Sequence, residues 1–325
     1  MAKIKYREAL NAALKEEMVR DPAVFCLGAG IAERGGSYKV TEGLLDMFGK
    51  KRVIDTPLSE ASFVGMAGGA AIAGARPVVE ILFVDFTFLV MDQLANQIAK
   101  YRFMSGNQGH VPMVLRTQGG SGNGLAGQHS QSLEAIFCHI PGLQVVMPAT
   151  PYDAKGLLKT AIRSDDPVVF IEHKLLYLTE GEVPEEEYLI PFGKADIKRE
   201  GSDITLVTYS NMLLHSLKAA ETLEQEGIDV EVIDLRSLVP LDMESILSSV
   251  KKTGRLVVVH EAVERCGVGG DIVARVVENA FYALEAPVLR VAGKNTTVPF
   301  NKTIEALCVP SVNDIVAGVR QVMQS

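Results

Sequence analysis

The chain has 325 residues, of which 47% are hydrophobic and 22% charged, and its formal net charge at pH 7 is -8. This length predicts two domains, and the composition is that of a globular protein with a sizeable core. The acidic balance and the lack of a basic block argue against a nucleic acid as the main partner.

The N-terminal segment and the cysteines predict a cytoplasmic protein. MAKIKYREALNAAL has the pattern of an amphipathic helix and lacks the continuous apolar core of a signal peptide. No apolar run reaches membrane-spanning length, because charged residues and a proline interrupt the most apolar region. The four cysteines are widely spaced, and we interpret them as buried, reduced thiols: Cys26, Cys138, Cys266 and Cys308.

Short apolar strands alternate with helical stretches in the first half of the chain. The strands are expected at Val24–Leu27, Val53–Ile54, Val78–Phe83, Val111–Arg116, Leu143–Met147 and Val168–Glu172. The helices are expected at Tyr6–Val19, at Thr41–Phe48, from Ser59 to an end at Arg76-Pro77, from Thr87 or Phe88 to Arg102, and at Tyr152–Arg163. This alternation predicts an α/β fold with a mostly parallel sheet covered on both faces.

The stretch from Val53 to Gln93 contains the first candidate site. Ser59 stands where a helix N-cap is expected, with its hydroxyl accepting from an unpaired backbone N–H. Glu60 follows in the first helical turn, where the helix dipole favours negative charge. The residues alone leave two interpretations open, a solvated acid that complements the dipole or a functional carboxylate at the mouth of an apolar unit.

The helix after Glu60 is built mostly from glycine and alanine. A glycine inside a helix costs up to about 1 kcal/mol relative to alanine. We expect close packing against another helix or subunit to offset the four glycines of this stretch, Gly65, Gly68, Gly69 and Gly74.

Two glycine-containing loops offer further candidates. Gly28-Ala29-Gly30 resembles the start of a dinucleotide fingerprint, but no third glycine precedes a helix, so a nicotinamide site is disfavoured. The polar loop Gln118–Gln131 is long, and long loops inside compact domains are usually functional. Its single imidazole, His129, is either a surface histidine or a ligand-facing group.

An acidic segment, Thr179–Pro191, breaks the alternation, and we interpret it as an interdomain linker. The pattern then restarts and predicts a smaller α/β domain of about four parallel strands. These strands are expected at Ile204–Tyr209, Val230–Leu235, Arg255–His260 and Val288–Val291. We therefore divide the chain into a first domain over residues 1–178, a linker over 179–192 and a second domain over 193–325.

Long segments of the chain match one family in order. They include RVIDTPLSEASFVGMAGGAAIAG, MDQLANQIAKYRFMSG, QHSQSLEAIFCHIPGLQVVMPATPYDAKGLL and VEVIDLRSLVPLD. Over essentially its whole length, the chain resembles the beta subunit of the thiamine-diphosphate-dependent decarboxylating component of 2-oxo acid dehydrogenase complexes. HKLLY, GEVPEE and IPFGKADI are most similar to the acetoin dehydrogenase branch, followed by pyruvate dehydrogenase.

The resemblance implies a fold, a partner and an oligomeric state. The fold is a pyrimidine-binding domain followed by a transketolase C-terminal-like domain. The partner is an alpha subunit, without which the chain is inactive, in an α2β2 heterotetramer that works with a lipoyl acyltransferase core.

The same resemblance implies roles for four side chains. Glu60 is the catalytic acid that contacts N1′ of the cofactor's aminopyrimidine ring and promotes proton loss from the thiazolium C2. Leu58 forms part of the pyrimidine wall, and Phe86 stacks on or near the ring, although from its sequence alone Phe86 is expected in the core. His129 matches the active-site histidine that stabilises the intermediate or assists acyl transfer to the lipoyl group.

The chain also resembles only half of a cofactor site. It lacks the Gly-Asp-Gly and downstream Asn-Asn pattern that holds Mg²⁺ and the diphosphate, so the resemblance implies that the alpha subunit holds Mg²⁺. Members of the family often bind a monovalent cation such as K⁺ through backbone carbonyls. Here these carbonyls are expected at Met113, Ala161, Ser164 and Asp166.

One departure from the family follows the first strand. Members of the family usually carry acidic residues after the first glycine, and one of these acids is assigned to a proton relay between two active sites. This chain has Ala29 and Gly30 at those positions, and the nearby Glu33 is a candidate replacement. Three hypotheses follow. The chain is an enzyme subunit acting on acetoin, pyruvate or a branched-chain 2-oxo acid, a catalytically reduced scaffold subunit, or a nicotinamide oxidoreductase.

Overall fold

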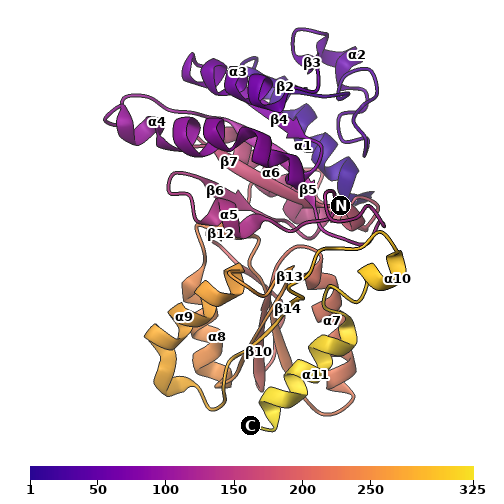
Figure 1. Cartoon of the computed structure of the whole chain (residues 1–325), viewed down its shortest axis with the longest axis vertical. Coiled ribbons are helices and arrows are strands. Elements are labelled where there is room, and N and C mark those ends of the chain that lie inside the picture. Colours follow the sequence, from indigo (N-terminus) through magenta and orange to yellow (C-terminus); the bar gives the residue numbers. More distant parts are fainter. The chain divides into compact units, whose positions relative to one another are not determined.

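The computed structural model describes residues 1–325, which form two compact units (Figure 1). The first unit comprises residues 1–119 and 136–192, and the second comprises residues 120–135 and 193–325. The glycine-rich loop after residue 119 therefore clusters with the C-terminal half of the chain, although we expected it within a first domain that runs to residue 178.

The first unit is built on a parallel sheet in which its six strands follow the order β6-β7-β5-β4-β2-β3. The bounds are β2 Val24–Gly28, β3 Val53–Asp55, β4 Arg76–Ile81, β5 Val114–Gly119, β6 Gln144–Val146 and β7 Val168–His173. All six strands predicted for this half of the chain are confirmed. Every residue of β5 and β7 is buried, as expected for central parallel strands with both faces covered.

Helices of the first unit pack in two groups. Helix α1 (Tyr6–Arg20) packs against α6 (Pro151–Arg163), and α3 (Glu60–Ile72) packs against the irregular helix that follows β4. That irregular helix, predicted as one regular element, changes pitch twice: a 3-10 helix η1 (Val84–Val90), a π-helix η2 (Asp92–Ile98) and then α4 (Ala99–Met104). The shorter helices are α2 Leu44–Phe48, α5 Glu134–Cys138 and η3 Lys174–Leu176.

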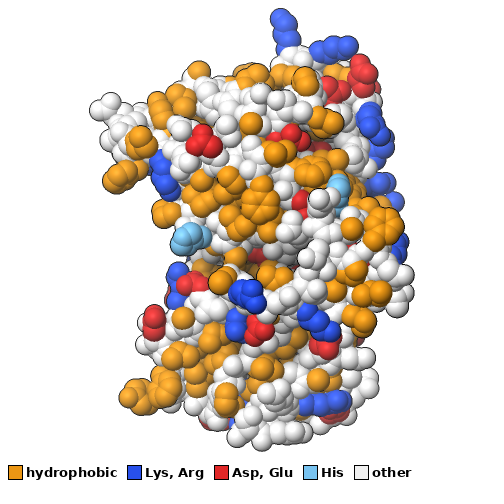
Figure 2. Space-filling view, viewed as in Figure 1, with side chains coloured by type: hydrophobic (Ala, Val, Ile, Leu, Met, Phe, Trp, Pro, Cys, Tyr) orange, Lys and Arg blue, Asp and Glu red, His pale blue; other side chains and the backbone are white.

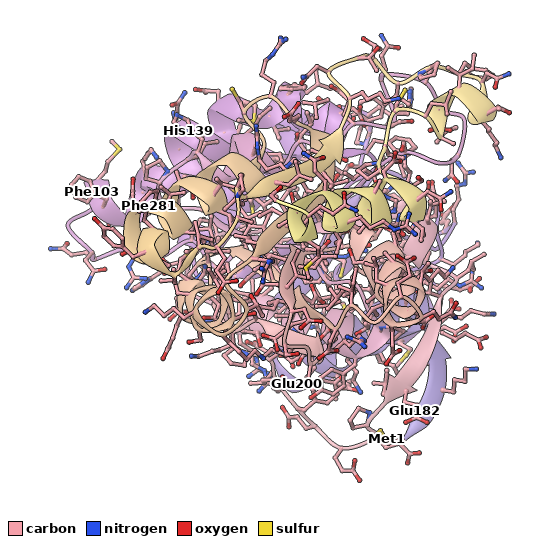
Figure 3. All side chains as sticks on the ribbon, turned by 90° about the horizontal axis from the view of Figure 1, so that it is seen from below. Met1, Phe103, His139, Glu182, Glu200 and Phe281 are labelled. Atoms are coloured by element: carbon pink, nitrogen blue, oxygen red, sulfur yellow. The ribbon has the colours of Figure 1, made fainter.

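A separate two-stranded ribbon joins the start of the chain to the segment we expected to be a linker. Strand β1 (Ala2–Lys5) pairs antiparallel with β8 (Glu180–Val183), which brings Met1 and Glu182 close together (Figure 3). The first unit continues to Phe192. Residues 179–192 are thus partly ordered by backbone pairing with the N-terminal strand.

The second unit contains a five-stranded sheet in the order β14-β13-β10-β11-β9. The bounds are β9 Asp196–Arg199, β10 Ile204–Thr208, β11 Val230–Asp234, β13 Leu256–Val263 and β14 Leu289–Gly293. A short strand, β12 at Ser237–Val239, is not part of this sheet. Four of these strands are parallel and were predicted, whereas β9 is an antiparallel edge strand that we did not predict.

Two pairs of helices flank this second sheet (Figure 1). One pair is α7 (Met212–Glu224) with α11 (Val312–Met323), and the other is α8 (Met243–Thr253) with α9 (Val268–Ala280). The shorter elements are η4 Phe281–Ala283 and α10 Lys302–Glu305. Side-chain caps fix two helix starts, because Asp242 accepts from the Ser245 N–H and Ser311 from the Asp314 N–H.

A buried ionic cluster ties three strands of the first sheet together. Arg116 on β5 is 2% exposed and donates to Glu172 on β7 at 2.7 and 2.8 Å and to Glu80 on β4 at 2.8 Å. Tyr177 donates to Glu172 at 2.6 Å. Burial alone would lower the pKa of Arg116, but the two carboxylates raise it, and burial raises the pKa of Glu172. Each charge in this cluster depends on the others for compensation.

Candidate active site

The turn that precedes α3 is fixed by backbone hydrogen bonds. The Thr56 N–H donates to the Gly28 carbonyl at 3.0 Å, which ties the turn to the end of β2. Ser59 is the N-cap residue, as predicted, and its carbonyl accepts from Ser62 at 3.0 Å. The predicted hydroxyl cap is wrong, because the Ser59 hydroxyl donates to Ser62 Oγ at 2.9 Å instead of accepting from a helix N–H.

Glu60 is the first residue of α3, where the positive end of the helix dipole meets the side chain. The residue is half-buried, and its carboxylate makes no hydrogen bond or ion pair within this chain. Leu58, two residues earlier, is 82% exposed. The Glu60 carboxylate thus has no partner within the chain, and the nearby apolar side chain of Leu58 is not covered by other residues.

Phe86 lies on η1, which packs against α3. Its ring is half-buried and meets Phe83 edge-to-face, with centroids 5.6 Å apart. Lys174 Nζ lies 5.4 Å from the Phe83 ring. Glu60, Leu58 and Phe86 therefore come from adjoining elements of the first unit.

An exposed apolar face continues from this region along α3 and η1. Met66 and Ile72 on α3 are 52% and 44% exposed, and Phe88 and Leu89 on η1 are 52% and 59% exposed. Figure 2 shows hydrophobic side chains at the surface where α3 and α4 run.

The glycines of α3 divide into three kinds. Gly68 is buried, and a Cβ there would lie 2.9 Å from Ile98 on η2, so glycine is required by packing within the chain. Gly65 and Gly69 are exposed; a Cβ at Gly65 would make ordinary contact with Gln93 at 3.6 Å, and one at Gly69 would meet nothing within 4 Å. Gly74 lies beyond the helix end with φ at +100°, so it terminates the helix instead of packing inside it, contrary to our expectation.

His129 belongs to the second unit, in the loop between β5 and α5. The His129 side chain is half-buried, and the backbone N–H of His129 donates to the Ala126 carbonyl at 3.2 Å, closing a tight turn. The base of the loop is closed by the Gly120 N–H, which donates to the Gln131 carbonyl at 2.9 Å. Three residues hydrogen-bond to this loop or to the start of α5 and were not predicted from the sequence: Glu261, Glu305 and Tyr209.

Of the four carbonyls expected to hold a cation, those of Ala161, Ser164 and Asp166 lie at or just after the end of α6, and that of Met113 directly precedes β5. Val168 N–H donates to the Met113 carbonyl at 2.9 Å, and Ser164 N–H donates to that of Ala161 at 3.2 Å. Ser164 Oγ donates to the Asp166 carbonyl at 3.1 Å. Each oxygen keeps a second lone pair.

Arg76 competes with a cation at one of these carbonyls. Its guanidinium donates to the Ser164 carbonyl at 2.9 Å and to the Asp165 carboxylate at 2.6 Å. The neighbourhood thus already contains one fixed positive charge. No group of three His, Cys, Asp or Glu side chains comes together as a metal site.

The segment after β2 differs from a dinucleotide-binding turn. No helix follows Gly28 directly, because the next helix, α2, begins at Leu44. Glu33, the proposed replacement for the missing relay acid, lies at the surface with Lys50 3.7 Å away. No helix of the structure has the length and apolarity needed to cross a membrane.

Comparison with known families gives a consistent result. Residues 2–179 match the transketolase pyrimidine binding domain, and residues 193–315 match the transketolase C-terminal domain. A split-gene transketolase, described as an inactive beta4 tetramer, has a similar fold with a TM-score of 0.81, at 23% identity over 99% of this chain and 98% of that chain.

Curated relatives are similar over nearly the full length of both chains. The beta subunit of acetoin:2,6-dichlorophenolindophenol oxidoreductase from Cupriavidus necator is 49% identical over 99% of this chain and 98% of its own. Pyruvate dehydrogenase E1 beta subunits from Rickettsia felis and Staphylococcus epidermidis are 48% and 47% identical, covering 98% and 100% of both chains.

The two domains define the class first: this is a two-domain transketolase-like protein. The chain belongs to the family of beta subunits of thiamine-diphosphate-dependent 2-oxo acid and acetoin dehydrogenases.

Proposed function

We propose that this chain activates thiamine diphosphate as the beta subunit of an acetoin or pyruvate dehydrogenase. When bound, the cofactor would supply a nucleophilic carbon that adds to the substrate carbonyl and a ring that stores the electron pair released when the bond beside that carbonyl breaks. The Glu60 carboxyl shares a proton with the ring nitrogen N1′, while Leu58 and Phe86 cover the ring and exclude water. The observation that carries this proposal is the partnerless Glu60 carboxylate at the start of α3.

These residues fit one edge of a flat nitrogen heterocycle. A carboxylate that the chain does not pair can accept a proton or a hydrogen bond from a ligand. The exposed side chain of Leu58 gains from being covered, at roughly 25 cal/mol per Å² of apolar surface removed from water.

An alpha subunit completes the site in this proposal. The exposed apolar side chains of α3 and η1 are unlike an ordinary solvent-facing helix surface. Gly65 and Gly69 lie on the exposed side of α3 and leave space for another backbone to approach. We assign the diphosphate and Mg²⁺ to the alpha subunit, in an α2β2 heterotetramer that is active only when assembled.

His129 acts in the second half of the reaction, the transfer of the acyl group to a lipoyl group of the acyltransferase core. An imidazole can deliver or take the proton that this transfer requires. The loop of His129 supports this role, because it offers backbone polar groups and glycines that permit close approach.

We further propose that K⁺ stabilises the first unit at the carbonyls of Met113, Ala161, Ser164 and Asp166. The position of three of these carbonyls at or just after the end of α6 supports this proposal, and the Arg76 guanidinium at the Ser164 carbonyl would compete with the cation there. The test of this cation is given with the other predictions below.

The experiment for the main proposal is co-expression with the alpha subunit. Dye-linked oxidation of acetoin, pyruvate and branched-chain 2-oxo acids is then measured on the purified assembly. Faster turnover of acetoin than of the other substrates places the chain among the acetoin dehydrogenases, whereas faster turnover of pyruvate places it among the pyruvate dehydrogenases.

A catalytically reduced scaffold is the second candidate, favoured by Ala29 and Gly30 at the relay position and by the surface location of Glu33. An assembly that binds thiamine diphosphate but turns over none of these substrates establishes the scaffold and refutes the enzyme.

A further inference from the structure

The loop that carries His129 has little conformational preference of its own. It contains four positions with positive φ, at Gly120 (+86°), Gly122 (+108°), Gly124 (+69°) and Ala126 (+62°). Glycine populates such conformations without steric cost and equally populates others, so the observed conformation must be imposed by contacts. All of the contacts described below come from the second unit.

Glu305 holds the first half of the loop. The residue ends α10 and is 0% exposed. Its Oε1 accepts from the Gly122 N–H at 2.8 Å, and its Oε2 accepts from the Gly124 N–H at 2.7 Å. Asn301 caps α10 by accepting from Thr303 at 2.9 Å. Because this buried carboxylate accepts from a loop amide at each of its two oxygens, both hydrogen bonds are charge-assisted and short.

Glu261 and Tyr209 hold the flanks. Glu261 Oε1, from β13, accepts from the Ser121 N–H at 2.6 Å and from its hydroxyl at 3.3 Å. Tyr209, just after β10, donates to Glu134 at 2.8 Å where the loop enters α5. The loop is thus tied near its start to strand β13 and at its end to the residue that follows β10.

Packing against the rest of the second unit is close at two glycines of the loop. A Cβ at Gly124 would lie 3.0 Å from Lys302, and one at Gly127 would lie 2.4 Å from Thr297. On another side, residues 130–133 line a cavity of about 570 Å³. On the side that borders the cavity, side-chain packing does not restrain the loop, so its conformation there depends more on hydrogen bonds.

We propose that Glu305 and Glu261 are positioning residues that set the location of the His129 imidazole. The second unit, which contributes none of the expected cofactor contacts, thereby both carries and positions this imidazole. This inference rests on the role of His129 in acyl transfer proposed above. A displacement of about 1 Å at a reacting group costs on the order of 100-fold in rate.

The experiment uses the heterotetramer carrying Glu305→Gln, which keeps the size of the side chain but leaves one amide N–H facing an NH₂ group. The matched control is Glu231→Gln, because Glu231 is also buried in the second unit and lies on β11. Two rates are compared, dye-linked substrate oxidation and acylation of a free lipoyl domain. Hydrogen exchange is followed by mass spectrometry in peptides covering residues 120–132.

Glu305→Gln is expected to accelerate exchange in these peptides by about tenfold and to lower lipoyl acylation more than dye reduction. Glu231→Gln is expected to do neither. In a His129→Ala background, Glu305→Gln is expected to cause no further loss, because it acts through the imidazole. Full additivity of the two substitutions, or unchanged exchange, overturns the inference.

Failure of the proposed function gives a different pattern. If His129→Ala leaves both rates unchanged, the assigned role of the imidazole is wrong, and the claim that Glu305 positions a reacting group falls with it. The exchange data then report separately on whether the carboxylate anchors the loop.

Discussion

Replacing the buried His260 on β13 should flatten the pH dependence of stability between pH 7 and pH 5. The residue is 0% exposed, and its Nδ1 pairs with the Ala262 carbonyl oxygen at 3.0 Å, which requires a proton on Nδ1. Its Nε2 has no hydrogen-bond partner. A Cβ on Gly267 or Gly269 would lie 2.7 Å from the ring, so no space remains to solvate a second proton.

The magnitude follows from the pKa. Burial lowers the pKa of His260 from 6.5 to about 4, against the raising effect of the hydrogen bond to Ala262, and Arg290 lowers it further. Between these values the unfolded chain binds a proton that the folded chain does not. Stability is therefore unaffected above pH 6.5 and falls as the pH drops toward 4, with a deficit of about 2 kcal/mol at pH 5.

The assay is urea unfolding at pH 7 and pH 5 for the parent chain, His260→Asn and the control His110→Gln, at one protein concentration. Asparagine keeps an N–H near the position of Nδ1 but does not titrate. His110 is exposed, so its replacement should leave the pH profile unchanged. The parent and the control should lose about 2 kcal/mol more than His260→Asn between the two pH values. Parallel profiles for all three proteins would refute the reasoning.

Three further predictions concern the first unit. Gly68→Ala should destabilise the chain by about 1–3 kcal/mol because the added Cβ meets Ile98. Gly69→Ala should instead stabilise the isolated chain by up to about 1 kcal/mol and weaken its association with the alpha subunit. Thermal unfolding measures the changes in stability, and size-exclusion chromatography measures the association. Arg116→Met should cost about 3–5 kcal/mol in urea unfolding, because it leaves two buried carboxylates uncompensated, and a loss below 1 kcal/mol contradicts the cluster's role. KCl should raise the melting temperature above that in N-methylglucamine chloride at equal ionic strength, and equal melting temperatures refute the cation site.

The sequence predicted regular elements well where local pattern determines them. Every predicted strand of the two sheets is present because apolar runs between turns can be buried on both faces only in covered sheets. The β1–β8 ribbon was missed because its strands are four residues long and pair across most of the first unit's sequence. Strand β9 was missed because Asp196–Arg199 is an edge strand with polar residues.

The candidate site was predictable only in part. The N-cap pattern and the family resemblance pointed to Glu60, but the hydroxyl of Ser59 found an acceptor in Ser62 that the pattern did not reveal. Glu261 and Glu305 carried no signal at all, because each is a single acid more than a hundred residues from the loop that it holds. Such contacts follow from topology, and no short motif encodes them.

Glu60→Gln in the assembled heterotetramer tests the central claim most directly. The matched control is Glu8→Gln, because Glu8 is also a first-turn acid but accepts from the Lys5 N–H at 2.9 Å. We predict that Glu60→Gln keeps thiamine diphosphate binding, measured by calorimetry, and lowers dye-linked turnover on the order of 100-fold or more, while Glu8→Gln keeps both. Turnover of Glu60→Gln equal to that of Glu8→Gln would show that this carboxylate is only a solvated helix-end acid.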